Sequence, residues 1–557
     1  MVQVWQRIWQ RLAEFRQLLL IGAIAAAALA AAPGPKFYDD DPLWREPKPL
    51  PVAEAAERDI VEQYEFFRNT FHEPYKPERE DGTTPRAQNA NTMDEVPDST
   101  WYTNRFGSPD TIPHQRMSIE DLLRGPGETN RPSMDGPWTV LSNKSTGVTP
   151  GFMILDSTGK KFILKFDPPL HPDLTTAVDV IGSKFFYALG YNVPENHIVT
   201  FTSGQLRLTA KSRHKDPDGH ERPMTARDLD DILAYTALDR EGRYRAMASY
   251  FIPGKIIGPF RFTGTRSDDP NDVVPHENRR ELRGLYVFAA WLNHTDAKSG
   301  NTLDSLVDEN GLPYIKHYLV DFGAILGSAT LQPKNPADGH VYFFNIKPAA
   351  VQFATLGLDV PRWDRATYRE VREAGRFDAA SFDPDDWKPD YPNIAFDIRR
   401  PDDDFWAAKR VMAFTDADIR AVVGTGEYSD PRAAEWIAEA LMGRRNKIGR
   451  AFFSRLLPLD NFRIGAGRIA FDDLAVRYGL RAARSYRIQW ARFDNRAGRK
   501  QGPLDSVGAA IPEQFRVSPA GQYFAADISS DDPRKTVTVY LRKTAAGFEV
   551  AGIDRHW

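Results

Sequence analysis

Two short motifs near the middle of the chain carry two aspartates and an asparagine. The first reads His294-Thr295-Asp296-Ala297-Lys298-Ser299-Gly300-Asn301, and the second, Asp321-Phe322-Gly323, begins twenty residues after the asparagine. Phosphoryl transfer needs one carboxylate beside the attacking hydroxyl and two oxygen ligands on Mg²⁺, all facing one phosphate. Two aspartates and an asparagine can supply that set. The alternative interpretation is a solvated turn followed by an unrelated aspartate.

Both motifs resemble those of the protein-kinase-like superfamily at every defining position. Its catalytic loop reads H-x-D-x-K-x-x-N and its metal-binding turn reads D-F-G. The resemblance implies that Asp296 orients or deprotonates the acceptor and that Lys298 neutralises the γ-phosphate. It also implies that Asn301 and Asp321 hold metal, with ATP and Mg²⁺ as cofactors.

A lysine in an apolar strand is the next candidate. Lys165 lies in Phe162-Ile163-Leu164-Lys165-Phe166, where a lysine ordinarily prefers an edge or a surface. The resemblance implies that Lys165 binds the α- and β-phosphates and pairs with an acid on the following helix. The family usually offers glutamate there, whereas this chain offers Asp179, one methylene shorter. Asp179 therefore needs a closer helix, makes a weak pair, or is a surface residue.

Two further segments match the family less well. The loop from Ser142 to Gly151 contains only Gly147 and Gly151 in place of G-x-G-x-x-G. It covers phosphate through amides or hydroxyls, or it is a plain hairpin turn. The segment from Tyr250 to Gly254 resembles the hinge where main chain binds adenine, the alternative being a strand that ends in a turn.

The resemblance covers about residues 138 to 350 and points to atypical members of the superfamily. The loop lacks an H-R-D-L core, and no A-P-E follows Gly323. A predicted helix, Gly190 and Asn192-Val193-Pro194 precede a strand, as in HipA-like kinases and phosphatidylinositol-kinase-like lobes. Secretory-pathway kinases are a third comparison.

Hydrophobic periodicity predicts a mixture of strands and helices, a helical C-terminal extension and a small terminal β module. Together with this pattern, the resemblance implies an α+β, bilobal protein-kinase-like fold. Three antiparallel strands are expected from Trp138, and a helix is expected from Ala177 to Leu189. Another helix should run from Arg279 to Leu292, and a third should start at Asp430-Pro431. The predicted segments are 1–32 (signal peptide or anchor), 33–136 (extended linker on the surface of the main domain), 137–350 (kinase-like core), 351–458 (helical extension) and 459–557 (β-rich domain).

The N-terminus resembles a targeting segment. Leu18 to Ala32 is an unbroken apolar run of 15 residues, preceded by Arg7, Arg11 and Arg16. An export signal fits this pattern, with a cleavage-like Ala28-Leu29-Ala30. The alternatives are an uncleaved membrane anchor, favoured by the amphipathic stripe that precedes the run, and a buried core helix. Either membrane interpretation predicts a periplasmic or extracytoplasmic location, with membrane contact through the N-terminus.

Composition excludes several classes of protein function. The net charge of −4 leaves no basic excess for nucleic acid, and the absence of cysteine excludes disulfides and thiolate metal sites. The acidic runs Asp402-Asp403-Asp404 and Asp383 to Asp386 are predicted to be solvated surface, the alternative being cation binding. The expected partners are a nucleotide and a hydroxyl acceptor, which is a protein, a lipid or a sugar. The alternatives to a phosphotransferase are a non-catalytic kinase-like scaffold or binding protein of the cell envelope, and a transferase that moves another part of ATP.

Overall fold

The structure is a computed structural model of the 557-residue chain. It describes residues 34–71, 84–106, 117–144, 147–216, 218–344, 353–355, 358, 360–504 and 508–557. Among these residues, no helix has both the length and the apolar character needed to cross a membrane. The predicted signal peptide or anchor lies outside the described residues.

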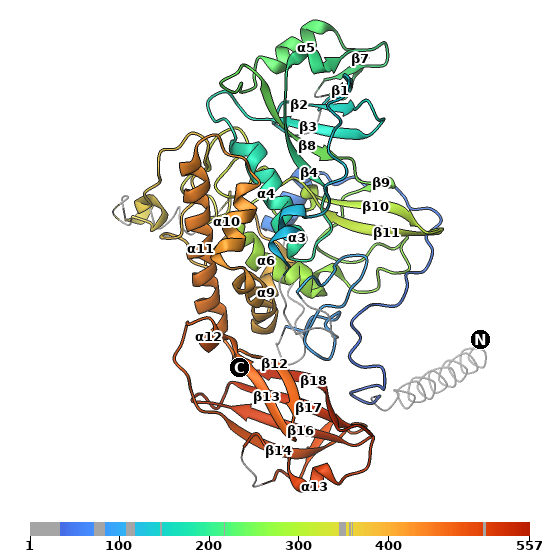
Figure 1. The fold of residues 1–557 in the computed structure, drawn as a ribbon, viewed down its shortest axis with the longest axis vertical. Coiled ribbons are helices and arrows are strands. Elements are labelled where there is room, and N and C mark those ends of the chain that lie inside the picture. Colours follow the sequence, from blue (N-terminus) through green and yellow to red (C-terminus); the bar gives the residue numbers. More distant parts are fainter. Residues whose placement is uncertain are drawn as a thin grey trace, which may run out of the picture.

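The first lobe is built on an antiparallel sheet with the order β4-β8-β3-β2-β1 (Figure 1). Its strands are β1 (Trp138–Asn143), β2 (Gly151–Leu155), β3 (Lys161–Phe166), β4 (Asn196–Phe201) and β8 (Tyr244–Tyr250). Three short strands extend it beyond β1: β5 (Leu206–Arg207), β6 (Arg213–Lys215) and β7 (Glu221–Pro223). The three antiparallel strands expected from Trp138 are confirmed.

Two helices cover opposite faces of this sheet. Alternate side chains of the central strands, such as Phe152, Phe162 and Leu164, form one apolar face beneath α5 (Ala226–Leu233). The other face contacts α4 (Leu174–Ala188), where Val180 packs on Ile198 and Met247. Because α4 connects β3 to β4, it sits where the kinase-like fold predicts the acid-bearing helix.

The second lobe is mainly helical and has one continuous core. Helix α6 (Arg280–Leu292) is buried over its whole length, so it needs neighbours on every side. The neighbours include α8 (Ile394–Asp397), α9 (Pro401–Ala413) and α11 (Pro431–Phe453). Also in this lobe are α10 (Asp416–Gly424), α3 (Ile119–Arg124) and a three-stranded sheet of β9 (Lys255–Gly258), β10 (Thr302–Glu309) and β11 (Leu312–Leu319). The bilobal fold with its helical C-terminal extension is confirmed. The extension contributes buried side chains from Val371 to Leu456 to the core of this lobe.

The terminal unit is β-rich and has its own core around Trp490 and Phe524 (Figure 1). Its larger sheet has the order β15-β14-β16-β17-β18. The strands are β12 (Leu459–Gly465), β13 (Arg468–Asp473), β14 (Arg487–Asp494), β15 (Arg499–Gln501), β16 (Tyr523–Ser529), β17 (Thr536–Lys543) and β18 (Phe548–His556), with short helices α12 (Leu474–Arg477) and α13 (Glu513–Arg516).

The prediction that residues 33–136 form a surface linker is wrong for much of the segment. Trp101 and Tyr102 are buried in the core of the second lobe, and α2 (Glu62–Phe71) lies against the loop after α6. The Tyr102 ring occupies the space beside Gly190, whose φ is +112° and whose added Cβ would lie 2.0 Å from that ring. Tyr102, in a short apolar segment, thus packs against Gly190, which lies 88 residues later in the sequence. No local pattern indicates this contact.

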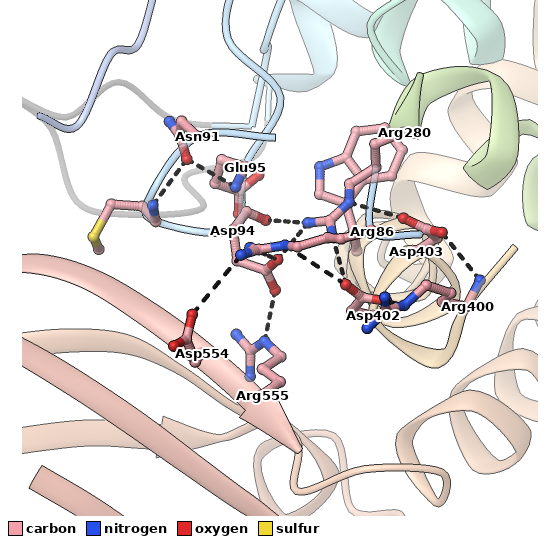
Figure 2. A network of polar contacts seen from close by, with 12 residues as sticks. Arg86, Asn91, Asp94, Glu95, Arg280, Arg400, Asp402, Asp403, Asp554 and Arg555 are labelled. Atoms are coloured by element: carbon pink, nitrogen blue, oxygen red, sulfur yellow. Dashed lines mark hydrogen bonds and ion pairs between the residues drawn. The ribbon is translucent and has the colours of Figure 1, made fainter. Parts of the chain in front are cut away.

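The run Asp402-Asp403-Asp404 is buried rather than solvated, so that prediction is also wrong. Arg280 is the reason: its guanidinium is 2.9 Å from Asp402 and 3.0 Å from Asp403, and it also binds Asp94. Figure 2 shows the same Asp94 contacting Arg555 of the terminal unit. Buried carboxylates at these positions are tolerated because each is paired with a guanidinium.

Candidate functional site

Lys165 of β3 lies between two carboxylates from other parts of the fold. Its ammonium group is 2.8 Å from Asp179 Oδ2 on α4 and 2.7 Å from Asp321 Oδ1 after β11. Asp179 is only 1% exposed and accepts a further bond from the Phe322 N–H at 3.2 Å. The surface interpretation of Asp179 is therefore excluded, and the pair with Lys165 is present.

The shorter acid reaches Lys165 because α4 approaches the Asp321-Phe322-Gly323 turn closely. Gly182, one helical turn after Asp179, makes that approach possible, since a Cβ there would lie 2.5 Å from Phe322 Cβ. Because Gly182 has no side chain, α4 can lie close enough to the turn for the shorter Asp179 side chain to reach Lys165.

Lys165 acts to lower the pKa of both Asp321 and Asp179. Burial acts to raise the pKa of Asp321, but the ion pair and hydrogen bond with Lys165 outweigh it and lower that pKa to about 2. Burial raises the pKa of Asp179, and Lys165 opposes this only in part. Asp321 is therefore ionised at neutral pH, as a cation ligand must be.

The loop after α6 brings three predicted residues together. Asn301 Nδ2 donates to Asp296 Oδ2 at 2.7 Å, and Lys298 Nζ lies 2.9 Å from Asp296 Oδ1. The Val320 N–H donates to the Asn301 carbonyl at 3.0 Å, which places this loop beside the residue before Asp321. Asn301 uses its amide nitrogen toward Asp296, so its amide oxygen is the atom left to bind a cation.

The ring of His294 packs against two aromatic rings, one of which belongs to the Asp321-Phe322-Gly323 turn. It is 5.7 Å from that of Phe186 and 6.1 Å from that of Phe322. Burial lowers the pKa of His294 to about 4, so the ring is neutral at pH 7. The histidine of the motif is a packing residue here.

The loop between β1 and β2 differs from its prediction. Gly147 is exposed, with φ of +70°, and contacts no predicted site residue. Gly151 lies opposite Lys165 in the sheet, and a Cβ there would be 2.1 Å from the Leu164 carbonyl oxygen. Strand packing alone thus explains Gly151, and the hairpin interpretation describes both glycines.

Lys144 in the same loop was missed by the sequence reasoning. Its stem passes over Gly151, and its ammonium donates to Thr149 Oγ1 at 3.2 Å and lies 2.8 Å from where a Cβ of Gly147 would be. Burial and the repulsion of Lys165 lower the pKa of Lys144 to about 8, although Asp321 and Asp179 act in the other direction. The only sequence signal was a lysine in a loop rich in hydroxyl residues.

In the segment from Tyr250 to Gly254, which is predicted to bind adenine through main chain, the first two N–H groups bond within the sheet. The Tyr250 N–H donates to the Glu195 carbonyl at 2.9 Å, and the Phe251 N–H donates to Lys161 at 3.0 Å. The Tyr250 ring packs on Phe162 at 5.6 Å. Both amides are used by the sheet, so the strand-and-turn interpretation fits Tyr250.

Helix α2 covers part of the loop, which no motif indicated. Glu62 Oε2 is 3.4 Å from Lys298 Nζ, and Glu65 binds the Ser299 hydroxyl and, at 3.2 Å, Tyr391. Burial acts to lower the pKa of Lys298, but Asp296 and Glu62 raise it above its ordinary value. Lys298 is therefore shared between a site carboxylate and a carboxylate of α2.

A cavity of about 670 Å³ is lined in part by Arg68 of α2 and does not belong to this site. It is lined by residues of 58–68 and 259–266, including Arg58, Arg261 and the buried Arg266, and it contains none of the predicted site residues.

No protein-family model matches the chain, and no curated protein matches its sequence. Among solved structures, two crystal structures of the Golgi casein kinase align with 60% of this chain and 73% of their own, at 9% identity. The TM-score is 0.28 for the one with Mn/ADP bound and 0.30 for the other. A likeness this distant carries no argument about chemistry, which therefore rests on the geometry above.

Proposed function

We propose that this protein is an ATP- and Mg²⁺-dependent phosphotransferase of atypical kinase type, acting on a hydroxyl acceptor. One observation carries the proposal: Lys165, Asp179 and Asp321, from β3, α4 and the turn after β11, meet at one point beside the Asp296 to Asn301 loop.

Each side chain has a role consistent with its contacts. Asp321 and the Asn301 amide oxygen would hold Mg²⁺, which when bound neutralises charge on the phosphates. Lys165, held by two carboxylates, presents its ammonium to the α- and β-phosphates. Asp296 is oriented by Asn301 and Lys298, so that it can accept a proton.

The proposed transfer is balanced in atoms and electrons. The acceptor hydroxyl oxygen forms a bond to the γ-phosphorus, and the bond from that phosphorus to the β,γ-bridging oxygen breaks. ADP leaves with that electron pair, and the hydroxyl proton moves to Asp296.

Binding and turnover can be tested separately. MgATP should raise the Tm of the wild-type protein and leave that of Asp321→Ala unchanged, because ligand binding to the native state is stabilising. Asp296→Asn should keep the Tm rise but lose release or transfer of phosphate from ATP labelled at the γ-position. ATP labelled at the α-position tests transfer of a different group.

Three outcomes would contradict the proposal. A wild-type protein that MgATP does not stabilise is not a nucleotide-dependent enzyme. Stabilisation without any transfer points to the non-catalytic scaffold. Unchanged turnover in Asp296→Asn would remove Asp296 from its role.

A further inference from the structure

A buried lysine outside the predicted motifs contacts the loop that carries Asp296. Lys334 follows Gly323 by eleven residues and is only 3% exposed. Its Nζ donates to Oγ1 of Thr295, the residue directly before Asp296, and Thr295 is equally buried. A buried hydrogen bond between two side chains restricts both of them to one arrangement, because breaking it would leave polar atoms unpaired.

The backbone is fixed on both sides of this contact. The Lys334 N–H donates to the Gly327 carbonyl at 2.8 Å, and the Lys334 carbonyl accepts from Arg376 Nη1 at 3.2 Å. The Thr295 carbonyl accepts from the Asp390 N–H at 2.9 Å. Thr295 is thus held through its hydroxyl and through its carbonyl by two segments that follow the candidate site in the sequence.

Thr295 attaches the end of the loop at which Asp296 lies. The two partners of the Asp296 carboxylate, Lys298 and Asn301, belong to the same loop, so they orient the carboxylate within that loop. The other end of the loop is attached at Asn301, whose carbonyl accepts from the Val320 N–H at 3.0 Å. The position of Asp296 relative to the candidate metal ligands therefore depends on the attachment of Thr295.

The contact does not require a charged lysine. Burial lowers the pKa of Lys334, whereas Asp390, Asp338 and Asp296 act in the other direction. A lysine side chain keeps N–H donors whether it is an ammonium group or a neutral amine. Lys334 can therefore donate to the Thr295 hydroxyl in either protonation state.

We propose that Lys334 and Thr295 are positioning residues, which hold Asp296 where it accepts the proton of the acceptor hydroxyl. This inference rests on the proposed function and extends it to a buried pair of side chains beside the loop. Misplacement of a reacting group by about 1 Å can slow a reaction about 100-fold. Loss of the hydrogen bond should therefore lower kcat more than it weakens nucleotide binding, because the proposed phosphate and metal ligands keep their own contacts.

Four single variants separate the hydrogen bond from a general effect on the fold. Thr295→Val removes the hydroxyl with little change of shape, Thr295→Ser keeps it, and Lys334→Met removes the amine. Thr236→Val is the matched control, because Thr236 is also buried and its hydroxyl donates to the Leu233 carbonyl at 2.7 Å, after α5 in the first lobe. Circular dichroism and the Tm without ligand establish that each variant is folded.

Thr295→Val should lower kcat for release or transfer of the γ-phosphate of MgATP about 10- to 100-fold. Its Kd for MgATP should stay within about twofold of the wild-type value. Thr295→Ser should recover most of the rate, and Thr236→Val should turn over as wild type. Lys334→Met should be as slow as Thr295→Val, and the double variant should be no slower than either, because both substitutions remove the same bond.

Hydrogen exchange gives a second measurement, which does not need turnover. The Lys298 N–H donates to the Asp296 carbonyl and the Asn301 N–H donates to the Lys298 carbonyl, so their exchange without ligand reports how well the loop is held. Both should exchange faster in Thr295→Val than in the wild-type protein, and at the wild-type rate in Thr236→Val.

The outcomes separate the positioning role from the function on which it rests. If the wild-type protein does not turn over MgATP, the proposed function fails and the positioning role fails with it. If the wild type turns over MgATP, and Thr295→Val keeps its kcat or its loop exchange, only the positioning role fails. Equal slowing in Thr295→Ser would also overturn that role, since the hydroxyl is then not what matters. A rise in Kd as large as the fall in kcat would do the same, because that pattern indicates a general disturbance of the site.

Discussion

At the scale of single residues, charge sharing is the main feature of the candidate site. Lys165 serves Asp179 and Asp321, and Lys298 serves Asp296 and Glu62. Each ammonium therefore already has two carboxylates before any phosphate arrives. A phosphate that binds Lys298 must compete with Glu62, which is the more exposed of its two partners.

We expect Glu62→Gln to strengthen MgATP binding. The substitution keeps the size of the side chain but removes the charge that competes for Lys298. Partly exposed ion pairs contribute about 0.2–1 kcal/mol, so the Kd should fall by about 1.5- to 5-fold in calorimetric titration. The matched control is Glu57→Gln, because Glu57 also lies 3.4 Å from a lysine, Lys255, outside the site. Weaker binding in Glu62→Gln, or an equal gain in the control, would contradict the prediction.

The sequence predicted residues that belong to dense motifs and missed those that do not. Asp296, Asn301 and Asp321 stand in two short motifs whose letters resemble a known family, so the resemblance indicated them. Glu62 reaches Lys298 from the distant helix α2, and Lys144 lies in the neighbouring β1–β2 loop. Their positions depend on tertiary packing, for which one sequence carries no periodic signal.

At the scale of elements, the approach of α4 to the turn after β11 determines whether Lys165 and Asp179 meet. Gly182 is the contact point: a Cβ there would lie 2.5 Å from Phe322 Cβ and 2.7 Å from Ile325 Cδ1. Neither neighbour can withdraw easily, because both side chains are fully buried in the core of the second lobe.

Gly182→Ala should therefore push α4 away from the turn. We expect it to destabilise the protein by about 1–3 kcal/mol, the usual cost of overpacking, and to weaken MgATP binding by lengthening the Lys165–Asp179 contact. Gly424→Ala at the end of α10 is the control, since open space surrounds that position and alanine favours helix. Urea denaturation and titration with MgATP measure the two effects. If Gly182→Ala is as stable as Gly424→Ala and binds MgATP normally, the close approach is not what positions Asp179.

The regular elements were largely predictable. The helix α4 and the start of α11 after Asp430-Pro431 follow from periodicity and from cap residues. The structure of segment 33–136 was not predictable from the sequence. Its short apolar stretches show no helical or strand periodicity, and they pack against residues that are distant in the sequence. Tyr102 against Gly190 is the clearest example.

At the scale of the whole molecule, Asp94 joins segments that lie far apart in the chain. It contacts Arg86 in the N-terminal segment, Arg280 on α6 and Arg555 on β18 (Figure 2). These ion pairs keep the pKa of the Asp94 carboxyl well below its ordinary value, although burial opposes them. The terminal β unit, predicted as a separate domain, is thus tied to the second lobe through a buried carboxylate.

This connection predicts that the terminal unit and the lobes unfold together. Arg555 lies 2.7 Å from Asp94 and also donates to the Leu459 carbonyl at 2.7 Å. Arg555→Ala should cost about 3 kcal/mol, near the lower end for breaking a buried pair, because Asp94 keeps Arg280 and Arg86. The terminal unit should then melt in a separate, earlier transition in differential scanning calorimetry, where the wild type shows one. Arg534→Ala, which removes an exposed pair with Asp532, should leave the trace unchanged. Two transitions already in the wild type, or one unshifted transition in Arg555→Ala, would show that Asp94 does not couple the two units.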